Sequence, residues 1–315
     1  MPKVLVLGGT GFLGTHVVRA FVRQGYQVEI ASRGTGVDAR DAELLARFLA
    51  RSRPDIVVNC IHNGGGIAYN LQRPVSIFED NLITGFNALR AAVRAKVGKF
   101  VSIMGNSSYP GALERHEEKH WWDGPLHESV LVSSMPRKAL WVQACAYRQE
   151  RNYQSIHLVL PNMFGPGDHF ELERSHALAA LLRKVWEAKQ AGVGEVEIWG
   201  TGKPVREWLY VEDAAEAIVR ATELYDEMEV LNLGRGEGRS IRELAEAIRE
   251  MLNWRGEFVY DLTRPDGAPA KVFDTSKMVA KLGWTPPTSL REGLQKTVEW
   301  FAQNQQDLAA GYRNS

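Results

Sequence analysis

A glycine-rich loop close to the N-terminus constrains the fold of this chain more strongly than any other segment. Gly8, Gly11 and Gly14 are spaced three residues apart. They follow the apolar run at residues 4–7 and precede a segment with helical spacing at residues 16–24. In a strand–loop–helix unit, such glycines permit a tight turn, close approach of a pyrophosphate to the backbone, and close packing of the helix on the strand. The motif predicts a dinucleotide-binding unit rather than a plain glycine turn, and its expected cofactor contacts are Gly8, Thr10, Gly11, Phe12, Leu13 and Gly14.

Apolar runs alternate with helical patterns through the first 160 residues. Strands are expected at residues 4–7, 26–31, 55–60, 100–104 and 156–160, and helices at residues 16–24, 42–52, 81–95 and 138–152. Strands that alternate with helices favour a parallel sheet with helices on both faces. Continuous apolar strands fit burial on both faces of that sheet. The predicted fold class is therefore α/β, with a doubly wound Rossmann-like parallel sheet.

The pattern becomes less regular after Pro161. Helices are expected at 177–191, 213–225, 241–252 and 290–303, and strands at 196–199, 208–211 and 230–233. Ser240 and Glu243 form the pattern of a capping box. Because no flexible linker separates the two parts, we expect a smaller C-terminal substrate domain that is interwoven with the first. The predicted domains are residues 1–160 plus about 196–235 for the cofactor, and residues 161–195 plus about 236–315 for the substrate.

The charge balance and the cysteine count exclude several classes of protein. The 38 Lys and Arg residues equal the 38 Asp and Glu residues, which argues against a general nucleic-acid binder with a basic face. Two cysteines, Cys60 and Cys145, provide neither a disulfide framework nor a thiolate zinc site. No apolar run approaches the ~18 residues of a membrane span, and the N-terminus lacks the features of a signal peptide. We expect a cytoplasmic protein without a metal site, a membrane segment or a nucleic-acid partner.

The segment after the second expected strand indicates which dinucleotide is bound. This strand ends at Ala31-Ser32-Arg33, without the acid that would hold the ribose 2′-hydroxyl of NAD. Arg33 can instead pair with a 2′-phosphate, which favours NADP(H), and the alternative is an Arg33 that is merely solvated. Asp38 either meets the adenine amino group or lies in an exposed loop. His62 follows the third strand, at the sheet edge where ligands bind, so it is assigned to the cofactor ribose or to the substrate.

Several longer segments carry a family resemblance that covers nearly the whole chain. They are GGTGFLG at 8–14, NGGGIAYNLQRPVSIFEDNL at 63–82, NMFGPGDHF at 162–170, SHALAALLRK at 175–184, WGTGKPVREWLYVEDAAEAI at 199–218, RPDGAPAK at 264–271 and DTSKMVAKLGW at 274–284. In these segments the chain resembles the extended short-chain dehydrogenase/reductase superfamily, which contains the nucleotide-sugar epimerases and dehydratases. Within that superfamily, the likeness is strongest to the GDP-L-fucose synthases, epimerase/reductases that act on a GDP-linked keto-deoxy sugar.

The resemblance implies a nucleotide-sugar substrate and assigns residues to it. His176 matches the histidine that acts as acid and base in epimerisation. The implied substrate-binding positions are Asn162, Lys184, Lys203, Arg206, Arg264 and Asp266. The resemblance also implies NADP(H) as the cofactor, a C-terminal domain that binds the nucleotide sugar, and a homodimer formed through the helices at 81–95 and 138–152.

The catalytic unit of this superfamily, a Ser or Thr followed by Tyr-x-x-x-Lys, is incomplete in this chain. Ser134 stands at the tyrosine position, and Lys138 stands at the lysine position, where it would hold the nicotinamide ribose. A serine hydroxyl titrates far above a phenol and is a poor proton donor. The cysteine of the epimerases falls on Ser107 or Ser108, where an alcohol cannot become an anion near neutral pH.

Three interpretations remain open at this point. The site can be rebuilt, with Tyr109, Ser107, Ser108, His176 and Lys138 sharing the proton transfers. The protein can retain only part of the reaction, such as a hydride transfer with a proton from water or an epimerisation by His176. It can also be a non-catalytic binder of NADP(H) and a nucleotide sugar, acting as a sensor or a partner subunit. We favour the first, an NADP-dependent nucleotide-sugar oxidoreductase or epimerase, because losing a catalytic residue does not remove a preformed site.

Overall fold

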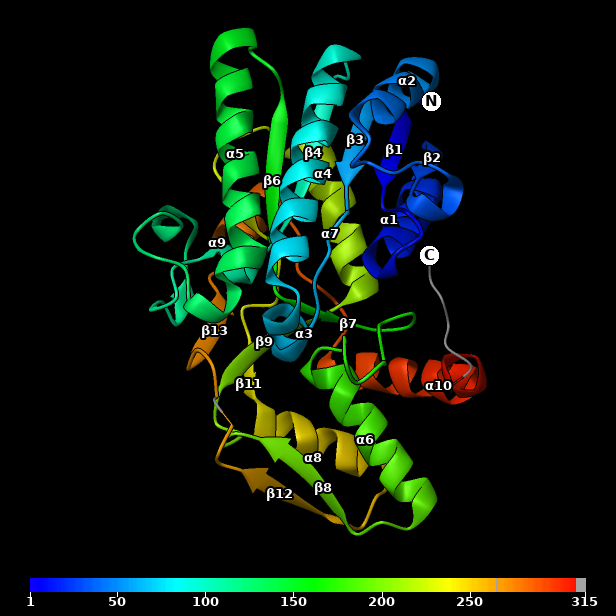
Figure 1. Ribbon diagram of the computed structural model, residues 1–315, viewed down its shortest axis with the longest axis vertical. Helices are drawn as coiled ribbons and strands as arrows, with labels where there is room; N and C mark the ends of the chain where they lie inside the picture. The colour runs from blue at the N-terminus through cyan, green and yellow to red at the C-terminus, as the bar shows by residue number, and fades with distance from the viewer. Residues whose placement is uncertain (265, 310–315) are drawn as a thin grey trace.

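A six-stranded parallel sheet organises the N-terminal part of the protein in the computed structural model, which describes residues 1–264 and 266–309 (Figure 1). Its strands are β1 (Lys3–Leu7), β2 (Gln27–Ala31), β3 (Ile56–Asn59), β4 (Lys99–Gly105), β6 (Ser155–Leu160) and β10 (Leu231–Asn232). They stand in the order β10-β6-β4-β3-β1-β2. Each neighbouring pair is parallel, which confirms the predicted α/β fold class.

Helices cover both faces of this sheet, as its apolar strands require. They are α1 (Phe12–Arg23), α2 (Ala42–Ser52), α4 (Pro74–Arg94), α5 (Leu131–Arg151), α7 (Val211–Leu224) and α9 (Ser276–Leu282). Leu5 and Leu7 belong to a core shared with α2, α4 and α5, whereas Val4 and Val6 belong to a core shared with α1, α7 and α9. Because successive side chains of a strand point to opposite faces, β1 contributes to both helical layers.

A second, smaller unit has its own sheets and its own core, and Figure 1 shows it below the first. The strands outside the six-stranded sheet are β5 (Arg115–His116), β7 (Asn162–Phe164), β8 (Glu195–Trp199), β9 (Val205–Tyr210), β11 (Gly238–Ser240), β12 (Glu257–Asp261) and β13 (Ala270–Phe273). The remaining helices are α3 (Ile67–Gln72), α6 (Ala177–Ala191), α8 (Ile241–Leu252) and α10 (Leu290–Ala309), with 3-10 turns at Arg33–Thr35, Asn106–Ser108, Glu118–His120 and Glu128–Val130. Side chains of α6, α8 and α10 form a separate apolar core with β8 and β9.

The chain passes between the two units more than once. One sheet has the order β11-β9-β13-β5, with β7 also paired to β9, and β12 pairs with β8. We expected residues 196–235 in the cofactor-binding domain, but β8 and β9 pair within the second unit, while α7 and β10 return to the first. The strand pairing favours a boundary after β9 instead of at residue 196. The division of the chain into two interwoven domains stays a prediction.

Two helices begin well before the expected residues. The helices α2, α6 and α8 have the predicted bounds, whereas α4 begins at Pro74 and α5 at Leu131 instead of at residues 81 and 138. Pro136 lies inside α5, where proline is unusual because it lacks an N–H donor. For α5, this proline explains why the sequence pattern suggested a start at residue 138. Within the described part of the chain, none of the helices combines the length and the apolarity that crossing a membrane requires.

Candidate active site

The glycine loop joins β1 to α1 at the edge of the sheet where the strands end. Gly8 has a φ of +74°, which favours glycine, and a Cβ there would lie 3.1 Å from the backbone nitrogen of Ile61. A Cβ at Gly14 would clash with the carbonyl oxygen of Gly8. Gly11 precedes α1 without a side-chain cap, so the first N–H groups of the helix remain available. These features fit the pyrophosphate of a dinucleotide, and the other predicted contacts in this turn are Thr10, Phe12 and Leu13.

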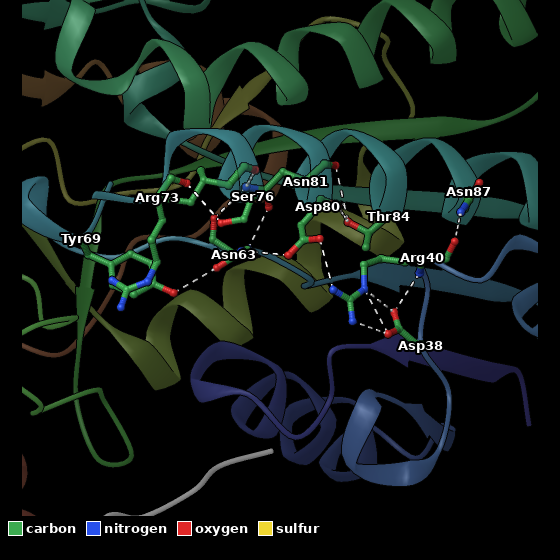
Figure 2. Close-up of polar contacts among 11 residues, drawn as sticks. Asp38, Arg40, Asn63, Tyr69, Arg73, Ser76, Asp80, Asn81, Thr84 and Asn87 are labelled. Carbon is green, nitrogen blue, oxygen red and sulfur yellow. Dashed lines mark hydrogen bonds and ion pairs between the residues drawn. The ribbon is translucent and has the colours of Figure 1, made fainter. Parts of the chain in front are cut away.

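Arg33 and Asp38 lie after β2, and their side chains differ in their contacts. Arg33 is exposed at the start of a 3-10 turn, and its guanidinium forms no hydrogen bond or ion pair with the described residues. Asp38 is instead bound by Arg40, whose Nη2 lies 2.6 Å from Oδ2, and this hydrogen-bonded guanidinium lowers the pKa of Asp38. Arg40 also reaches Asp80 on α4 at 3.3 Å (Figure 2). Asp38 is therefore part of an ordered network that joins this loop to α4.

The same network continues along α4 to the loop after β3 (Figure 2). The Nδ2 group of Asn81 donates to the carbonyl oxygens of Asn63 and Ile77, both at 2.7 Å. The Oδ1 atom of Asn81 accepts from the backbone N–H of Asn63 at 2.8 Å and lies 3.1 Å from Nδ1 of His62. Because both amide hydrogens are donated to carbonyls, Oδ1 is an acceptor and His62 Nδ1 carries the hydrogen. The neutral His62 ring therefore has its lone pair on Nε2.

A run of glycines brings His62 close to the segment before α6. A Cβ at Gly65 would lie 2.7 Å from the carbonyl oxygen of Arg174. A Cβ at Gly66 would lie 2.7 Å from the carbonyl oxygen of Ser175. The N–H of Gly66 donates to the Arg174 carbonyl at 3.0 Å. Such close backbone approach requires residues without a Cβ. It places His176 beside the loop that carries His62.

Solvent reaches the rings of His62 and His176, yet both are surrounded by protein groups that disfavour protonation. Burial, followed by the charges of His169, Arg137 and Arg174, lowers the pKa of His176 to about 4. Burial and then Arg137 also hold the pKa of His62 well below its ordinary value of 6.5. Both histidines are therefore neutral near pH 7, in the form that accepts a proton.

Arg137 on α5 lies next to these histidines. Its Nη1 occupies the place where a Cβ on Gly105 would stand, and Ser107 Oγ lies 3.5 Å from that place. Arg137 forms no ion pair with a carboxylate of the described residues, and burial lowers its pKa to about 10. A guanidinium without a counter-charge is suited to bind an anion. We refer to four residues as the histidine–arginine cluster: His62, Arg137, Arg174 and His176.

Lys138, which we expected in the cofactor site, does not join this cluster. Its ammonium donates to the carbonyl oxygen of Trp121 and lies 4.2 Å and 4.0 Å from the ring centroids of Trp121 and Trp122. The side chain is buried, and burial lowers its pKa to about 8. Adjacent residues of a helix point about 100° apart, so Arg137 reaches the histidines while Lys138 turns toward the tryptophans. The predicted catalytic and cofactor-binding role of Lys138 stays a prediction, and these contacts with the tryptophans speak against it.

Among the hydroxyl groups proposed for the site, Ser107 adjoins the cluster. Ser134 is buried and donates to Ser107 Oγ at 2.7 Å. Ser108 is also buried, and it donates to a backbone carbonyl at 2.7 Å while it accepts an indole N–H at 3.1 Å. The Tyr109 hydroxyl donates to a buried asparagine at 2.7 Å, and burial raises its pKa. Ser108 and Tyr109 therefore hold the loop after β4 in place, and their assignment to proton transfer stays a prediction.

Two cations stand opposite each other on paired strands of the second unit. Arg206 on β9 is in register with Lys271 on β13. Burial lowers the pKa of both, that of Lys271 to about 8, and neither forms an ion pair with a carboxylate in the described ranges. Such cations suit a diphosphate. Sequence reasoning assigned Arg206 and missed Lys271, although Lys271 ends the quoted segment RPDGAPAK and is the one cation of a short strand.

Two predicted substrate residues contact other side chains and backbone groups of the second unit. Asp266 accepts from the backbone N–H of Thr201 at 2.7 Å and from its hydroxyl at 2.8 Å. Its two carboxylate oxygens therefore hold the turn after β8, and its assignment as a substrate ligand stays a prediction. Arg264 lies over the ring of Trp199, 4.7 Å from the centroid. Through these contacts, both residues hold the segment after β12 against the turn after β8.

The remaining substrate positions are spread over the same unit. Lys184 donates to a carbonyl of β8 at 3.1 Å, Asn162 donates to a carbonyl of β9 at 3.4 Å, and Lys203 is exposed. A pocket of about 380 Å³ opens between β9, α8 and α10, but none of the predicted site residues lines it. The chemistry-bearing side chains are therefore gathered at the histidine–arginine cluster and on β9 and β13, not in this pocket.

Comparison with known proteins identifies the family. Residues 4–234 match the NAD dependent epimerase/dehydratase family. The chain belongs to this family. GDP-L-fucose synthase 1 of Arabidopsis thaliana is 33% identical over 312 residues, which cover 96% of this chain and 94% of the relative. GDP-L-fucose synthase of Escherichia coli (strain K12) is 31% identical over 320 residues, which cover 96% and 97%.

Solved structures agree with this family in fold. A GDP-L-fucose synthetase from Naegleria fowleri bound to NADP has a TM-score of 0.86 at 26% identity, and the match covers 97% of this chain and 95% of that chain. A GDP-6-OMe-4-keto-L-xylo-heptose reductase from C. jejuni has a TM-score of 0.89 at 24% identity, with 96% and 98% covered. Family membership confirms the Rossmann-like fold, the enzyme class of epimerases and oxidoreductases, and a nicotinamide dinucleotide as the cofactor.

Proposed function

We propose that this protein is an NADP-dependent epimerase/reductase of a GDP-linked keto-deoxy sugar, with an active site that lacks Tyr-x-x-x-Lys. The similarity to GDP-L-fucose synthases extends over nearly the whole chain. The NADP-bound relative of known structure supports the same cofactor. The exposed Arg33, which has no partner among the described residues, would hold the 2′-phosphate that distinguishes NADP from NAD.

One observation carries this proposal: the candidate site contains cations without neutralising carboxylates. Arg137, Arg174, Arg206 and Lys271 form no ion pair with a carboxylate within the described residues, and burial lowers the pKa of Arg137, Arg206 and Lys271. Holding a partly desolvated cation without a counter-charge costs free energy. A dianionic pyrophosphate would offset that cost, and so would negative charge that develops on a carbonyl oxygen during reaction.

Each part of the site then has a distinct task. When bound, the reduced nicotinamide would supply the hydride for reduction of the sugar carbonyl. Arg206 and Lys271 would hold the diphosphate, and Arg137 would stabilise negative charge on the carbonyl oxygen. His176 would move protons at the carbons beside the carbonyl, where a neutral imidazole can accept them. The domain boundary proposed here gives residues 1–160 and 211–235 to the cofactor and the rest to the nucleotide sugar.

The test is an assay of turnover with matched substrates. Purified protein is mixed with NADPH and GDP-4-keto-6-deoxy-mannose, and NADPH absorbance and the sugar product are followed together. We expect NADPH to be consumed in proportion to the reduced GDP-sugar, with little turnover of the UDP-linked and dTDP-linked analogues. Thermal stabilisation by NADPH and by the GDP-sugar without any turnover would instead support the non-catalytic sensor.

We further propose that the protein acts as a homodimer in the cytoplasm. The adjoining helices α4 and α5 carry exposed apolar side chains, among them Ile83 and Val142, and an exposed apolar face on a helix pair is typical of an interface. Both cysteines are free, as in a reducing compartment. Ile83→Glu should shift the molar mass measured by light scattering from dimer to monomer.

A further inference from the structure

The loop after β3 carries a histidine whose hydrogen bonds leave one ring nitrogen free. Asn81 fixes the hydrogen of His62 on Nδ1 through its Oδ1 atom, at 3.1 Å. Asn81 is itself held by Asn63, whose side chain donates to Asp80 at 3.0 Å (Figure 2). Asp80 in turn accepts from Arg40 at 3.3 Å. These contacts from α4 fix the orientation of the ring, so the lone pair of His62 stays on Nε2.

The groups around His62 keep it unprotonated. Arg137 reaches it from α5, and Arg174 and His176 reach it from the segment before α6. All three are cationic or become cationic on protonation, and the neighbouring Asp80 is already paired with Arg40 and Asn63. Each positive charge disfavours a second one on the His62 ring. His62 is thus present in the neutral form, with a defined acceptor nitrogen.

His176 differs from His62 in one respect that matters for a base. Its ring forms no hydrogen bond with the described residues, although it is the N-cap residue of α6. The hydrogen of a neutral His176 ring is therefore not fixed on either nitrogen. In the histidine–arginine cluster, His62 is the member with a preset proton acceptor. Arg137, beside it, forms no ion pair with a carboxylate of the described residues.

We propose that His62 is the catalytic base that removes a proton from the carbon next to the substrate carbonyl; this inference rests on the proposed function. In the step, the C–H bond breaks, an N–H bond forms at Nε2, and the electron pair moves onto the carbonyl oxygen. Arg137 stabilises the resulting enolate. The carbon then regains a proton, from protonated His62 with unchanged configuration or, with inversion, from His176 after His176 has taken up a proton from solvent. In the second case protonated His62 returns its proton to solvent. The electron pair returns to the carbon, the carbonyl re-forms, and nothing is oxidised or reduced.

Exchange of substrate hydrogen with solvent deuterium tests this role apart from reduction. The full-length protein is incubated in D₂O with GDP-4-keto-6-deoxy-mannose and without NADPH, and NMR follows deuterium at the carbons beside the carbonyl. His62→Gln should slow the exchange about 100-fold or more, the usual contribution of a positioned base. His176→Gln should retain exchange and lose the inverted product. His120→Gln is the matched control, because His120 is a partly exposed histidine that pairs with Asp123, and it should exchange at the unmodified rate.

A second variant reports on the base itself rather than on folding. Asn81→Asp places a carboxylate next to Nδ1 of His62, and an adjacent negative charge raises the pKa of an imidazole by about 1–3 units. The acid limb of the exchange rate against pH should therefore move upward by about one unit or more. A limb that stays in place in Asn81→Asp contradicts the proposed base.

Consumption of NADPH separates this inference from the proposed function. If the unmodified protein oxidises NADPH with the GDP-sugar while His62→Gln exchanges deuterium as fast as the unmodified protein, His62 is not the base and the proposed function stands. If the unmodified protein neither oxidises NADPH nor exchanges deuterium, both proposals are wrong. Loss of exchange in His62→Gln, with the thermal unfolding midpoint unchanged and with His120→Gln exchanging at the unmodified rate, supports the inference.

Discussion

Replacing Lys138 by methionine distinguishes the position suggested by the sequence from the position found in the structure. The lysine is 3% exposed, and burial lowers its pKa from 10.5 to about 8. Between those two pH values the unfolded chain still binds the proton that the folded protein has released, so stability rises with pH in this window. Integration of the two pKa values gives a rise of about 2.5 kcal/mol in the free energy of unfolding between pH 7 and pH 10. Methionine carries no titrating proton and should remove that rise.

The assay combines denaturant unfolding with turnover. Unfolding of both proteins at pH 7 and pH 10 gives the two free energies, and the difference between the proteins cancels the titration of all other groups. In the turnover assay, Lys138→Met should stay within about threefold of the unmodified protein, since the ammonium contacts tryptophans only. Arg137→Gln should lower kcat about 10²–10³-fold, which corresponds to the loss of one oxyanion donor. Arg137→Lys keeps the charge and should retain part of the activity.

Either of two results would contradict the placement of Lys138 against the tryptophans. If Lys138→Met abolishes turnover as completely as Arg137→Gln, Lys138 takes part in the reaction. Alternatively, both proteins can gain the same stability between pH 7 and pH 10, which would mean that Lys138 is not desolvated by its tryptophan surroundings.

Two further predictions concern the cofactor and the acid stability. Arg33→Ala should reduce the preference for NADPH over NADH by about 1.5–3 kcal/mol, the range for a hydrogen bond to a charged group; equal affinities of the unmodified protein for both cofactors, measured by fluorescence titration, would contradict the assignment of Arg33. His157 is fully buried, and burial lowers its pKa to about 3, so the unfolded chain binds a proton below pH 6.5 that the folded protein rejects. This histidine should remove about 2 kcal/mol of unfolding free energy between pH 7 and pH 5. In His157→Gln the fall should be smaller by that amount, and equal falls in both proteins would contradict it.

Helix bounds could be predicted where the sequence carries its own start signals. α8 begins at a capping box in which Ser240 and Glu243 bind each other's backbone, and α2 begins at Asp41, whose side chain accepts from two backbone N–H groups. α5 has no side-chain cap, and Pro136 lies within it. α5 packs against α4, a contact that the sequence pattern does not display.

The histidine–arginine cluster could be predicted only in part, because it is assembled by contacts between residues that are distant in sequence. His62 and His176 were both singled out, but separately. They adjoin because Gly65 and Gly66 pack on the backbone of residues 174–175. Arg137 was missed because counting four residues from Ser134 selects Lys138. The direction that a helical residue faces depends on how the whole helix is rotated against its neighbours, and a count along the chain does not contain that rotation.

Ser134 stands where the resemblance implies a phenol, and the ammonium of Lys138 contacts tryptophans. In the proposed mechanism, other groups therefore move the proton. Arg137, with a pKa of about 10, keeps its proton near neutral pH, so it can stabilise negative charge without donating a proton to it. Ser134 donates a hydrogen bond to Ser107, and serine hydroxyls titrate far above neutral pH. In the proposed mechanism the proton transfers therefore pass to His62 and His176, whose pKa values rise once an anionic substrate offsets the cations around them. In this proposal an arginine stabilises the negative charge and two histidines transfer the protons, whereas the phenol–lysine pair of the superfamily combines these two roles.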